Sequence, residues 1–365
     1  MSNIPRPFCE KHGMTIPVVQ APMAGGPTTP ELVAAVCNAG GLGSLGAEYL
    51  SPGQMEHDIE RIRQLTRRPF AINLFSPDAD EALSGDFATV SEFLSRYHKR
   101  LSIGEPEFPK SPGENFDEQI EVLLRLRVPI VSFTLGAFPA RVMERLKEQS
   151  IYVMGTATTV KEAKLLEEAG VDAITAQGSE AGGHRGTFTA EAESVLVGAM
   201  ALVPQMVDAI SVPVLASGGI MDGRGIVAAM ALGASAAQMG TAFLACDEAG
   251  TSGTFRDALL QATEDQTTIT RAFSGRPARG LRNEFIEAWN KAGLKPMSFP
   301  WQNTLTRPMR RAAAIANDGG LQSMWAGQGL RLLRRGTAAS LMAQLQQEII
   351  EAVAETQKRL PVARQ

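Results

Sequence analysis

The sequence predicts an α/β protein: a (β/α)8 barrel, or TIM barrel, with a smaller domain that covers its mouth. Eight short apolar runs alternate with amphipathic helical stretches between residues 18 and 246, and eight such units in roughly 250 residues are typical of this barrel. The runs are apolar throughout, as expected for parallel strands buried on both faces. A doubly wound sheet is the alternative, but it usually has fewer units and a phosphate loop at its first turn.

The predicted elements follow one another along the chain with clear helix signals. Thr28 or Thr29 can cap the first barrel helix, and Gly40, Gly170 and Gly233 end three of the helices. The predicted strands are 18–23, 41–47, 69–75, 128–134, 151–156, 171–176, 213–216 and 236–245. The predicted barrel helices are 30–39, 51–66, 115–127, 139–149, 159–169, 194–210 and 222–232.

Three segments are expected. Residues 1–246 form the barrel, with an elaborated loop at 76–113 that contains one helix, 89–97. Residues 247–336 form the smaller region, and residues 337–365 form a C-terminal helix that packs back on the barrel. Within the smaller region the sequence predicts a helix at 254–262, a Thr-rich apolar run at 267–273, a basic glycine-rich stretch at 275–282 and a proline-broken loop at 293–308.

The composition excludes several classes of protein. The formal net charge of the 365 residues is -4, with no basic patch that would suggest nucleic acid. No apolar run is long enough to cross a bilayer. The three cysteines are far apart, which indicates reduced thiols and a cytoplasmic location, and no His, Cys and acidic residues share metal-ligand spacing, so no metal is predicted. The sequence leaves the oligomeric state open.

The residues at the strand ends are the first candidates for chemistry, because barrel enzymes work at that face. The candidate cofactor-binding residues there are Ala21, Pro22, Met23, Asn73, Gln177, Ser217, Gly218, Gly219, Gln238, Met239, Gly240 and Thr241. Backbone N–H groups of the glycine stretches at strands seven and eight are expected to hold a phosphate, helped by the positive end of a following helix. The alternative is that these glycines only make tight turns.

The loop at 177–186 carries the candidate catalytic residue, His184, beside Gly182 and Gly183. Glycines let the backbone approach a flat ligand closely, and a histidine can hold a proton near neutral pH. The amides of Asn73 and Gln177 suit the edge of a heterocycle. A surface turn with an incidental histidine is the alternative. The other three histidines, His12, His57 and His98, are expected to be exposed and uninvolved.

At these residues the chain resembles the nitronate monooxygenases, formerly called 2-nitropropane dioxygenases, and most closely their class I group. The matching stretches span nearly the whole chain: 20–23, 73–75, 131–133, 155–158, 176–186, 216–225, 233–243, 273–280 and 325–328. The resemblance implies an FMN-dependent barrel with a smaller substrate-binding domain. It also implies FMN contacts by Asn73, Gln177, Gly182, Gly218 and 238–241, with His184 as the catalytic histidine.

The resemblance implies that alkyl nitronates, among them propionate 3-nitronate, are oxidised with FMN and O2 to carbonyl compounds and nitrite. His184 would remove the α proton of a neutral nitroalkane, or only position an ionised nitronate. Arg276 or Arg279 are candidates to hold the anion, and equally are surface charges beside a turn. Two alternatives stay open: an NAD(P)H-dependent FMN reductase of the enoyl-acyl-carrier-protein or quinone type, and a non-catalytic barrel that binds flavin or a phosphate ligand.

Overall fold

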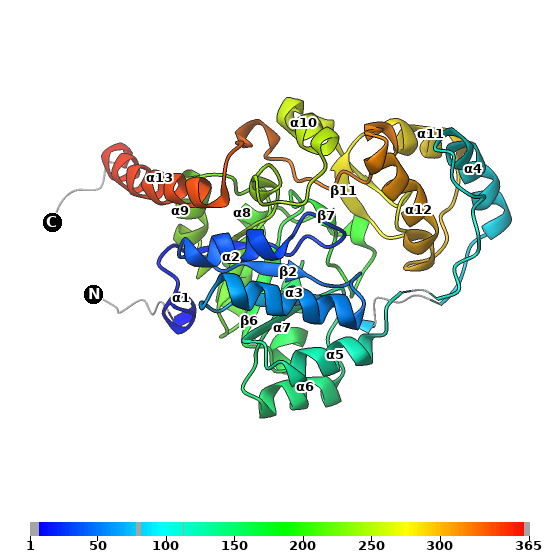
Figure 1. Ribbon diagram of the computed structural model, residues 1–365. Coiled ribbons are helices and arrows are strands. Elements are labelled where there is room, and N and C mark those ends of the chain that lie inside the picture. Colours follow the sequence, from blue (N-terminus) through cyan, green and yellow to red (C-terminus); the bar gives the residue numbers. More distant parts are fainter. Residues whose placement is uncertain (1–6, 78–81, 112, 361–365) are drawn as a thin grey trace.

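The computed structural model describes residues 7–77, 82–111 and 113–360. The ends of the first and last predicted segments, 1–6 and 361–365, and residues 78–81 and 112 of the predicted loop lie outside the described residues. Eight parallel strands form the centre of the molecule (Figure 1). They are β1 (Val18–Gln20), β2 (Ser44–Gly46), β3 (Ala71–Phe75), β4 (Ile130–Thr134), β5 (Tyr152–Ala157), β6 (Ala173–Gln177), β8 (Val214–Ser217) and β9 (Ala236–Met239).

These strands make a closed ring. Their order is β1-β9-β8-β6-β5-β4-β3-β2, and every pairing within it is parallel. The ring closes where Val19 of β1 bridges Leu42, just before β2, with the Gln20 N–H donating to the Leu42 carbonyl at 2.9 Å. The predicted (β/α)8 barrel is therefore confirmed.

Helices surround the ring where the amphipathic stretches predicted them. They are α2 (Pro30–Asn38), α3 (Pro52–Leu65), α5 (Phe116–Arg125), α6 (Ala140–Glu148), α7 (Val160–Glu168), α8 (Ala199–Ala209) and α9 (Gly223–Ala231). Thr29 caps α2, and Ser51 with Gln54 forms a capping box at α3. Such caps contribute about 1 kcal/mol each.

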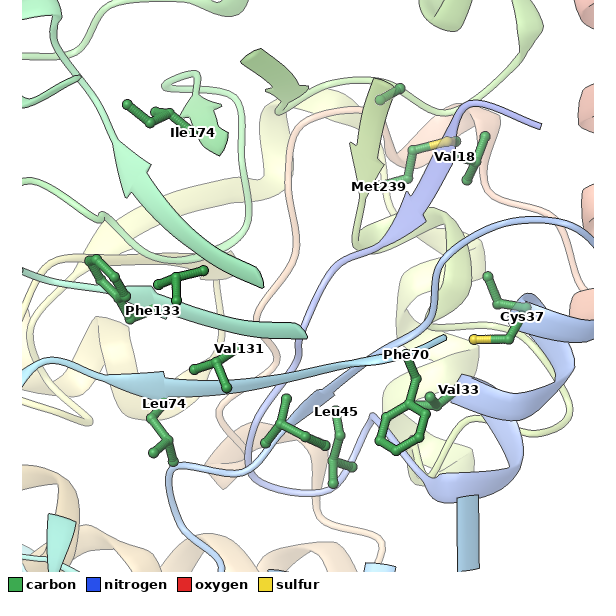
Figure 2. Packing of buried hydrophobic residues seen from close by; sticks show 14 of the residues in the cluster. Val18, Val33, Cys37, Leu45, Phe70, Leu74, Val131, Phe133, Ile174 and Met239 are labelled. Carbon is green, nitrogen blue, oxygen red and sulfur yellow. The ribbon is translucent and has the colours of Figure 1, made fainter. Parts of the chain in front are cut away.

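The seam between strands and helices is the main core. Val33 and Cys37 of α2 are fully buried in the same cluster as Leu45 of β2 and Phe70 (Figure 2). Each such apolar side chain contributes roughly 1.5–3 kcal/mol on burial. Packing of the helices on the strands therefore stabilises the barrel more than the helix caps do.

The bottom of the barrel is plugged by the short helix α1 (Pro7–Lys11). Phe8 is 1% exposed and packs in a cluster with inward-facing residues of the strands, such as Val19 and Ile130. His12 was expected to be exposed, but its ring lies 4.9 Å from the Phe8 ring and 4.5 Å from the Tyr152 ring, centroid to centroid. With this end filled, the barrel is accessible from the carboxyl ends of its strands.

A second core lies beside the barrel and involves α4 (Phe87–Arg100), α11 (Glu284–Ala292) and α12 (Trp301–Ile315). Figure 1 shows these helices together on the side of the barrel away from both termini. Helix α4 was predicted as part of an elaborated loop of the barrel, whereas its side chains share this second core. His98 on α4 was expected to be exposed but is 3% exposed, while His57 is exposed as expected.

Helix α12 replaces the second half of the proline-broken loop predicted at 293–308, so that prediction was wrong for residues 301–308. Pro308 lies inside the helix, where proline removes a backbone donor and costs about 3 kcal/mol. Leu305, Met309 and Ala313 are all buried in the second core. Their spacing of four residues places them on one helix face, and their burial outweighs the cost of the proline.

The smaller region also contains a three-stranded antiparallel sheet in the order β10-β11-β7. Its strands are β10 (Thr267–Thr270), β11 (Ala278–Leu281) and β7 (Gly183–His184). Through β7, the loop after β6 of the barrel pairs with this second sheet. Helix α10 (Gly253–Gln261) precedes β10.

The long helix α13 (Ala338–Arg359) ends the described chain and packs on α2 and α9. Leu341, Met342 and Leu345 of α13 belong to the main core, and the Glu348 carboxylate accepts the Gly223 N–H at 3.0 Å. The domain boundaries at residues 246 and 336 stay a prediction. Among the described residues, no helix is long and apolar enough to span a bilayer.

Candidate functional site

A cavity of about 660 Å³ opens at the carboxyl ends of the barrel strands, with α12 on its other side. Each candidate catalytic and cofactor-binding residue predicted from the sequence lies in its wall. These residues are Ala21, Pro22, Met23, Asn73, Gln177, Gly182, Gly183, His184, Ser217, Gly218, Gly219, Gln238, Met239, Gly240 and Thr241. The structure thus brings together fifteen residues that are spread over more than 200 positions of the chain.

The glycine turns after β8 and β9 form one end of the cavity. Gly218 and Gly219 have φ values of 112° and 72°, a region that side-chain-bearing residues rarely adopt. Among the hydrogen bonds of the described residues, none uses the backbone N–H of these two glycines, of Gly240 or of Thr241. Strand β9 ends at Met239, not at residue 245, so Gly240 and Thr241 belong to the turn itself.

The helix that follows β8 does not add free donors to this end. Its N-cap residue, Asp222, already accepts the N–H groups of Arg224 and Gly225, at 3.0 and 3.1 Å. The N-terminus of this helix was expected to help hold a phosphate, but its N–H groups already bind the Asp222 carboxylate. The donors left for a phosphate at this end are those of the glycine turns.

Gln177 braces the loop that presents His184. Its Nε2 donates to the His184 carbonyl at 3.0 Å, and its Oε1 accepts the Gly186 N–H at 2.8 Å. Arg185 turns away from the cavity and donates to the carbonyls of Gln177 and Val195. Because both ends of the Gln177 amide are engaged, this residue fixes the loop and keeps only one N–H for a ligand.

The His184 ring lies half-buried in the cavity wall. Its Nε2 is 2.9 Å from Ser274 Oγ. Phe75, Phe299 and Trp325 surround the ring, each with its centroid 5.8 Å from the imidazole centroid. Burial, followed by the nearby charges of Arg276 and Arg310, lowers the pKa of His184 to about 3. The imidazole is therefore neutral at physiological pH.

Two further amides face the cavity from the strands. Asn73 Nδ2 donates to Ser132 Oγ at 3.0 Å, and Gln238 Oε1 accepts from Thr175 Oγ at 3.3 Å. These contacts leave the Asn73 oxygen and the Gln238 nitrogen for a ligand. One acceptor and one donor are thus presented from two strands of the barrel, β3 and β9.

A cationic helix face forms the wall that the sequence analysis missed. Asn303, Arg307, Arg310 and Arg311 of α12 line the cavity. Their spacing of four, seven and eight residues places them on one helix face, but the prolines around them suggested a loop. Arg310 is held by Asn303, Thr306 and Ser323, and none of the described carboxylates pairs with it.

The arginines suggested from the sequence lie elsewhere. Arg279 donates to the Ser179 carbonyl and to Thr267 Oγ, both at 3.1 Å, and Arg276 donates to the Thr187 carbonyl at 3.1 Å. Neither residue lines the cavity, although the charge of Arg276 is felt at His184. The suggestion that Arg276 or Arg279 holds an anion in the cavity was therefore wrong.

Two polar groups beside the arginines have no partner among the described residues. Asn303 is 2% exposed, and its Nδ2 is unpaired. The Tyr49 hydroxyl is also buried and unpaired, and burial raises the pKa of Tyr49, so its proton is retained. An unpaired buried donor costs about 1–3 kcal/mol. Both groups line the cavity, where a ligand acceptor would satisfy them.

The tail segment at 325–327 closes the cavity against the His184 loop. The Gly327 N–H donates to Thr241 Oγ at 2.9 Å, and a Cβ on Gly182 would lie 2.5 Å from the Ala326 carbonyl carbon. The loop and the tail therefore meet through closely packed backbone at Gly182 and Ala326, in addition to the contact between the His184 and Trp325 rings. Within the described residues, no three His, Cys, Asp or Glu side chains gather in a group that could hold a metal ion.

Comparison with known proteins places this site in a family. The nitronate monooxygenase family matches residues 6–348. A probable nitronate monooxygenase of Staphylococcus saprophyticus is 45% identical over 328 residues, which cover 89% of this chain and 92% of the relative. The solved structure of a nitroalkane oxidase from Streptomyces ansochromogenes has a TM-score of 0.88 at 40% identity, covering 94% of this chain and 98% of that one.

A further solved structure, FabK from Thermotoga maritima, has a TM-score of 0.75 at 28% identity, covering 96% of this chain and 98% of that one. The two likenesses cover similar shares of the chain, but the identities to the nitronate monooxygenase and the nitroalkane oxidase are higher than the identity to FabK, and the family match extends over nearly the whole chain. The resemblance found in the sequence is confirmed. This chain is an oxidoreductase that belongs to the nitronate monooxygenase family.

Proposed function

We propose that the protein uses FMN to oxidise anionic alkyl nitronates with O2, giving carbonyl compounds and nitrite. The observation that carries this proposal is the pairing, in one cavity, of a neutral histidine with a cationic helix face that lacks a described acidic partner. A nitronate is an anion, and a buried guanidinium without a counter-ion favours an anionic ligand. Burial lowers the pKa of Arg310 to about 10, so it stays charged at neutral pH.

The cavity residues fit FMN. The glycine turns after β8 and β9 supply unpaired N–H groups for the phosphate, and a Cβ on Gly218 would lie 3.2 Å from the Ala181 nitrogen. The rim amides of Asn73 and Gln238, with the remaining N–H of Gln177, would meet the polar edge of the ring, and residues 21–23 would contact it. Once bound, FMN would take electrons from the substrate and pass them to O2.

His184 would act on the substrate in one of two ways. For a neutral nitroalkane, its unprotonated nitrogen removes the α proton and so produces the nitronate inside the cavity. For a nitronate added as the anion there is no proton to remove, and the ring only positions the substrate. Because the pKa of His184 is lowered to about 3, the base form is present at physiological pH.

The cationic helix face of α12 would discriminate between nitronates with and without a second negative charge. Propionate 3-nitronate carries a carboxylate in addition to its nitronate group, so it can pair with one of the two more buried arginines, Arg307 and Arg310, and with the Tyr49 hydroxyl. A buried charge-assisted hydrogen bond of this kind contributes roughly 1.5–3 kcal/mol. We therefore expect propionate 3-nitronate to be used more efficiently than ethyl nitronate.

The test is nitrite release and O2 uptake by protein reconstituted with FMN, using ethyl nitronate, propionate 3-nitronate and nitroethane. We expect nitrite from both nitronates, with the higher kcat/KM on propionate 3-nitronate. Absence of nitrite from every substrate would contradict the proposal. Flavin retention without nitrite would favour a barrel that binds flavin but does not catalyse this reaction.

The similarity to FabK at 28% identity supports a second candidate function, that of an NAD(P)H-dependent flavin reductase. A reductase would oxidise NADH at a rate that depends on an added acceptor. If NADH is consumed faster than any nitronate, the second candidate replaces the first.

A further inference from the structure

Ser274, between β10 and β11, is the hydrogen-bond partner of the His184 ring. Its Oγ lies 2.9 Å from His184 Nε2. The same hydroxyl donates to the Arg276 carbonyl at 3.0 Å and accepts the Arg276 N–H at 3.3 Å. Ser274 is 1% exposed, so water does not replace these contacts.

The direction of each hydrogen bond follows from the atoms involved. A serine hydroxyl has one proton and two lone pairs. A carbonyl oxygen only accepts, and the Ser274 hydroxyl donates its proton to the Arg276 carbonyl while one of its lone pairs takes the Arg276 N–H. In this arrangement the remaining lone pair of Ser274 faces Nε2 of His184, and it is satisfied when that nitrogen carries the proton.

We infer that Ser274 is a positioning residue that holds neutral His184 in its Nε2–H form, so that Nδ1 is the nitrogen that accepts the α proton of the substrate. This inference rests on the proposed function for its substrate. Among the described residues none forms a hydrogen bond with Nδ1, and the ring lies in the cavity wall. The lone pair of Nδ1 is therefore the one available to a ligand.

The arrangement also serves the protonated ring. When a nitroalkane reacts, its α C–H bond breaks, the electron pair stays on the substrate as the nitronate, and the proton bonds to Nδ1. Nε2–H continues to donate to Ser274, which continues to donate to the Arg276 carbonyl. Arg276, near β11, and Arg310, from α12, face the ring and disfavour its positive charge, so an unchanged hydrogen-bond partner is the stabilising contact left to the imidazolium.

The first test reads the tautomer directly by 15N-histidine NMR of the purified protein without substrate. The chain has only four histidines, and His184→Asn identifies the resonances of His184. We expect the Nε2–H pattern in the unmutated protein and a shift toward the Nδ1–H pattern in Ser274→Ala. An Nδ1–H pattern in the unmutated protein, or an unchanged pattern in Ser274→Ala, would overturn the inference. This result does not depend on activity, so it stands apart from any failure of the proposed function.

The second test compares nitroethane, which must lose a proton, with ethyl nitronate, which has none to lose. In Ser274→Ala we expect kcat on nitroethane to fall about tenfold or more, since a positioned base contributes on the order of 10²–10⁴-fold. The rate on ethyl nitronate should change less than about twofold by the same argument, and Ser274→Thr, which keeps the hydroxyl, should restore the nitroethane rate. An equal fall on both substrates would indicate a structural role and overturn the inference, as would no fall on either.

Ser298 provides the matched control. It is a buried serine, 6% exposed, whose hydroxyl also donates to one backbone carbonyl and accepts one backbone N–H, but the hydrogen-bond partner of the His184 ring is Ser274 and not Ser298. Ser298→Ala should leave the ratio of the nitroethane and ethyl nitronate rates unchanged. If it lowers that ratio as much as Ser274→Ala does, loss of a buried hydroxyl in general explains the effect, and the inference fails.

Discussion

One guanidinium nitrogen of Arg310 donates two hydrogen bonds to Asn303, which lies two turns earlier on the same helix. Arg310 Nη2 lies 2.6 Å from the Asn303 carbonyl oxygen and 2.8 Å from the Asn303 Oδ1. With Oδ1 held in this way, the Asn303 amide has only its Nδ2 left, and Nδ2 has no partner among the described residues. The pair thus sets both a charge and a free donor in the wall of the cavity.

Replacing Arg310 should therefore affect anionic substrates most. Removing one partner of a buried, hydrogen-bonded charge pair costs about 2 kcal/mol or more, so we expect Arg310→Met to lower kcat/KM for propionate 3-nitronate by about 30-fold or more. The effect on ethyl nitronate, which lacks the carboxylate, should be smaller. Steady-state kinetics with both substrates checks this prediction.

Arg311 is the control, because it is the next residue on α12 and is exposed. Arg311→Met should change kcat/KM for propionate 3-nitronate by only a few-fold, since an exposed charge is screened by solvent. If the two variants behave alike, the net charge of the helix matters and the position of Arg310 does not.

The acid limit of activity should lie well below the ordinary pKa of histidine. The pKa of His184 is lowered to about 3 by burial, with Arg276 and Arg310 acting in the same direction. Protonation removes the base, so activity on nitroethane should persist as the pH falls through 6.5 and decline only toward pH 4 or below. A pH profile of kcat/KM on nitroethane tests this expectation, and an acid limb centred near 6.5 would contradict it.

Folding stability should respond to pH through His12 at the bottom of the barrel. Burial, with a smaller effect of Lys11, lowers the pKa of His12 from 6.5 to about 4. The unfolded chain therefore takes up the proton first as the pH falls, and stability is lost from about pH 6.5 downward until the folded form is protonated too. By pH 4 the loss through this residue amounts to roughly 3 kcal/mol.

Denaturant unfolding at pH 7 and pH 4.5 measures this loss. Replacing His12 with phenylalanine should reduce the loss of folding stability between pH 7 and pH 4.5. His57→Gln, at an exposed site, should leave that loss unchanged. If the free energy of unfolding falls by the same amount between pH 7 and pH 4.5 in the unmutated protein and in the His12 variant, groups other than His12 dominate acid unfolding.

Gly182→Ala should separate the His184 loop from the tail. A Cβ at this position would lie 2.5 Å from both the Ala326 carbonyl carbon and the Gly327 nitrogen, and these backbone atoms cannot move aside as a flexible side chain can. Overpacking of this kind costs about 1–3 kcal/mol, so we expect a lower Tm and weaker retention of FMN. In contrast, a Cβ on Gly53 would meet nothing within 4 Å, and Gly53→Ala in α3 should leave Tm unchanged or slightly raised. A normal Tm and normal FMN binding in Gly182→Ala would show that the loop and tail can separate freely.

The barrel could be predicted because its evidence is local. Each strand is a short apolar run followed by a turn and an amphipathic helix, and the ring geometry then brings the strand ends together without further information. This is why Asn73, Gln177, Ser217 and Gln238 could be assigned to one cavity from their positions alone.

The opposite wall could not be predicted in the same way. Pro308 suggested a loop, whereas the cost of that proline is offset by the burial of Leu305 and Met309 against α4 and α11, which lie elsewhere in the sequence. The partner of β7 is likewise distant, because Gly183 pairs with Arg279. The four-residue spacing of the apolar residues in α12 was the one signal that could have revealed the helix and its arginines.

The most direct measurement is the flavin absorbance of the FMN-loaded protein after rapid anaerobic mixing with propionate 3-nitronate and, separately, with NADH. We predict fast bleaching by the nitronate, recovery of the absorbance with nitrite release when O2 is admitted, and little change with NADH. Flavin that stays oxidised in the presence of the nitronate but is bleached rapidly by NADH would contradict this prediction.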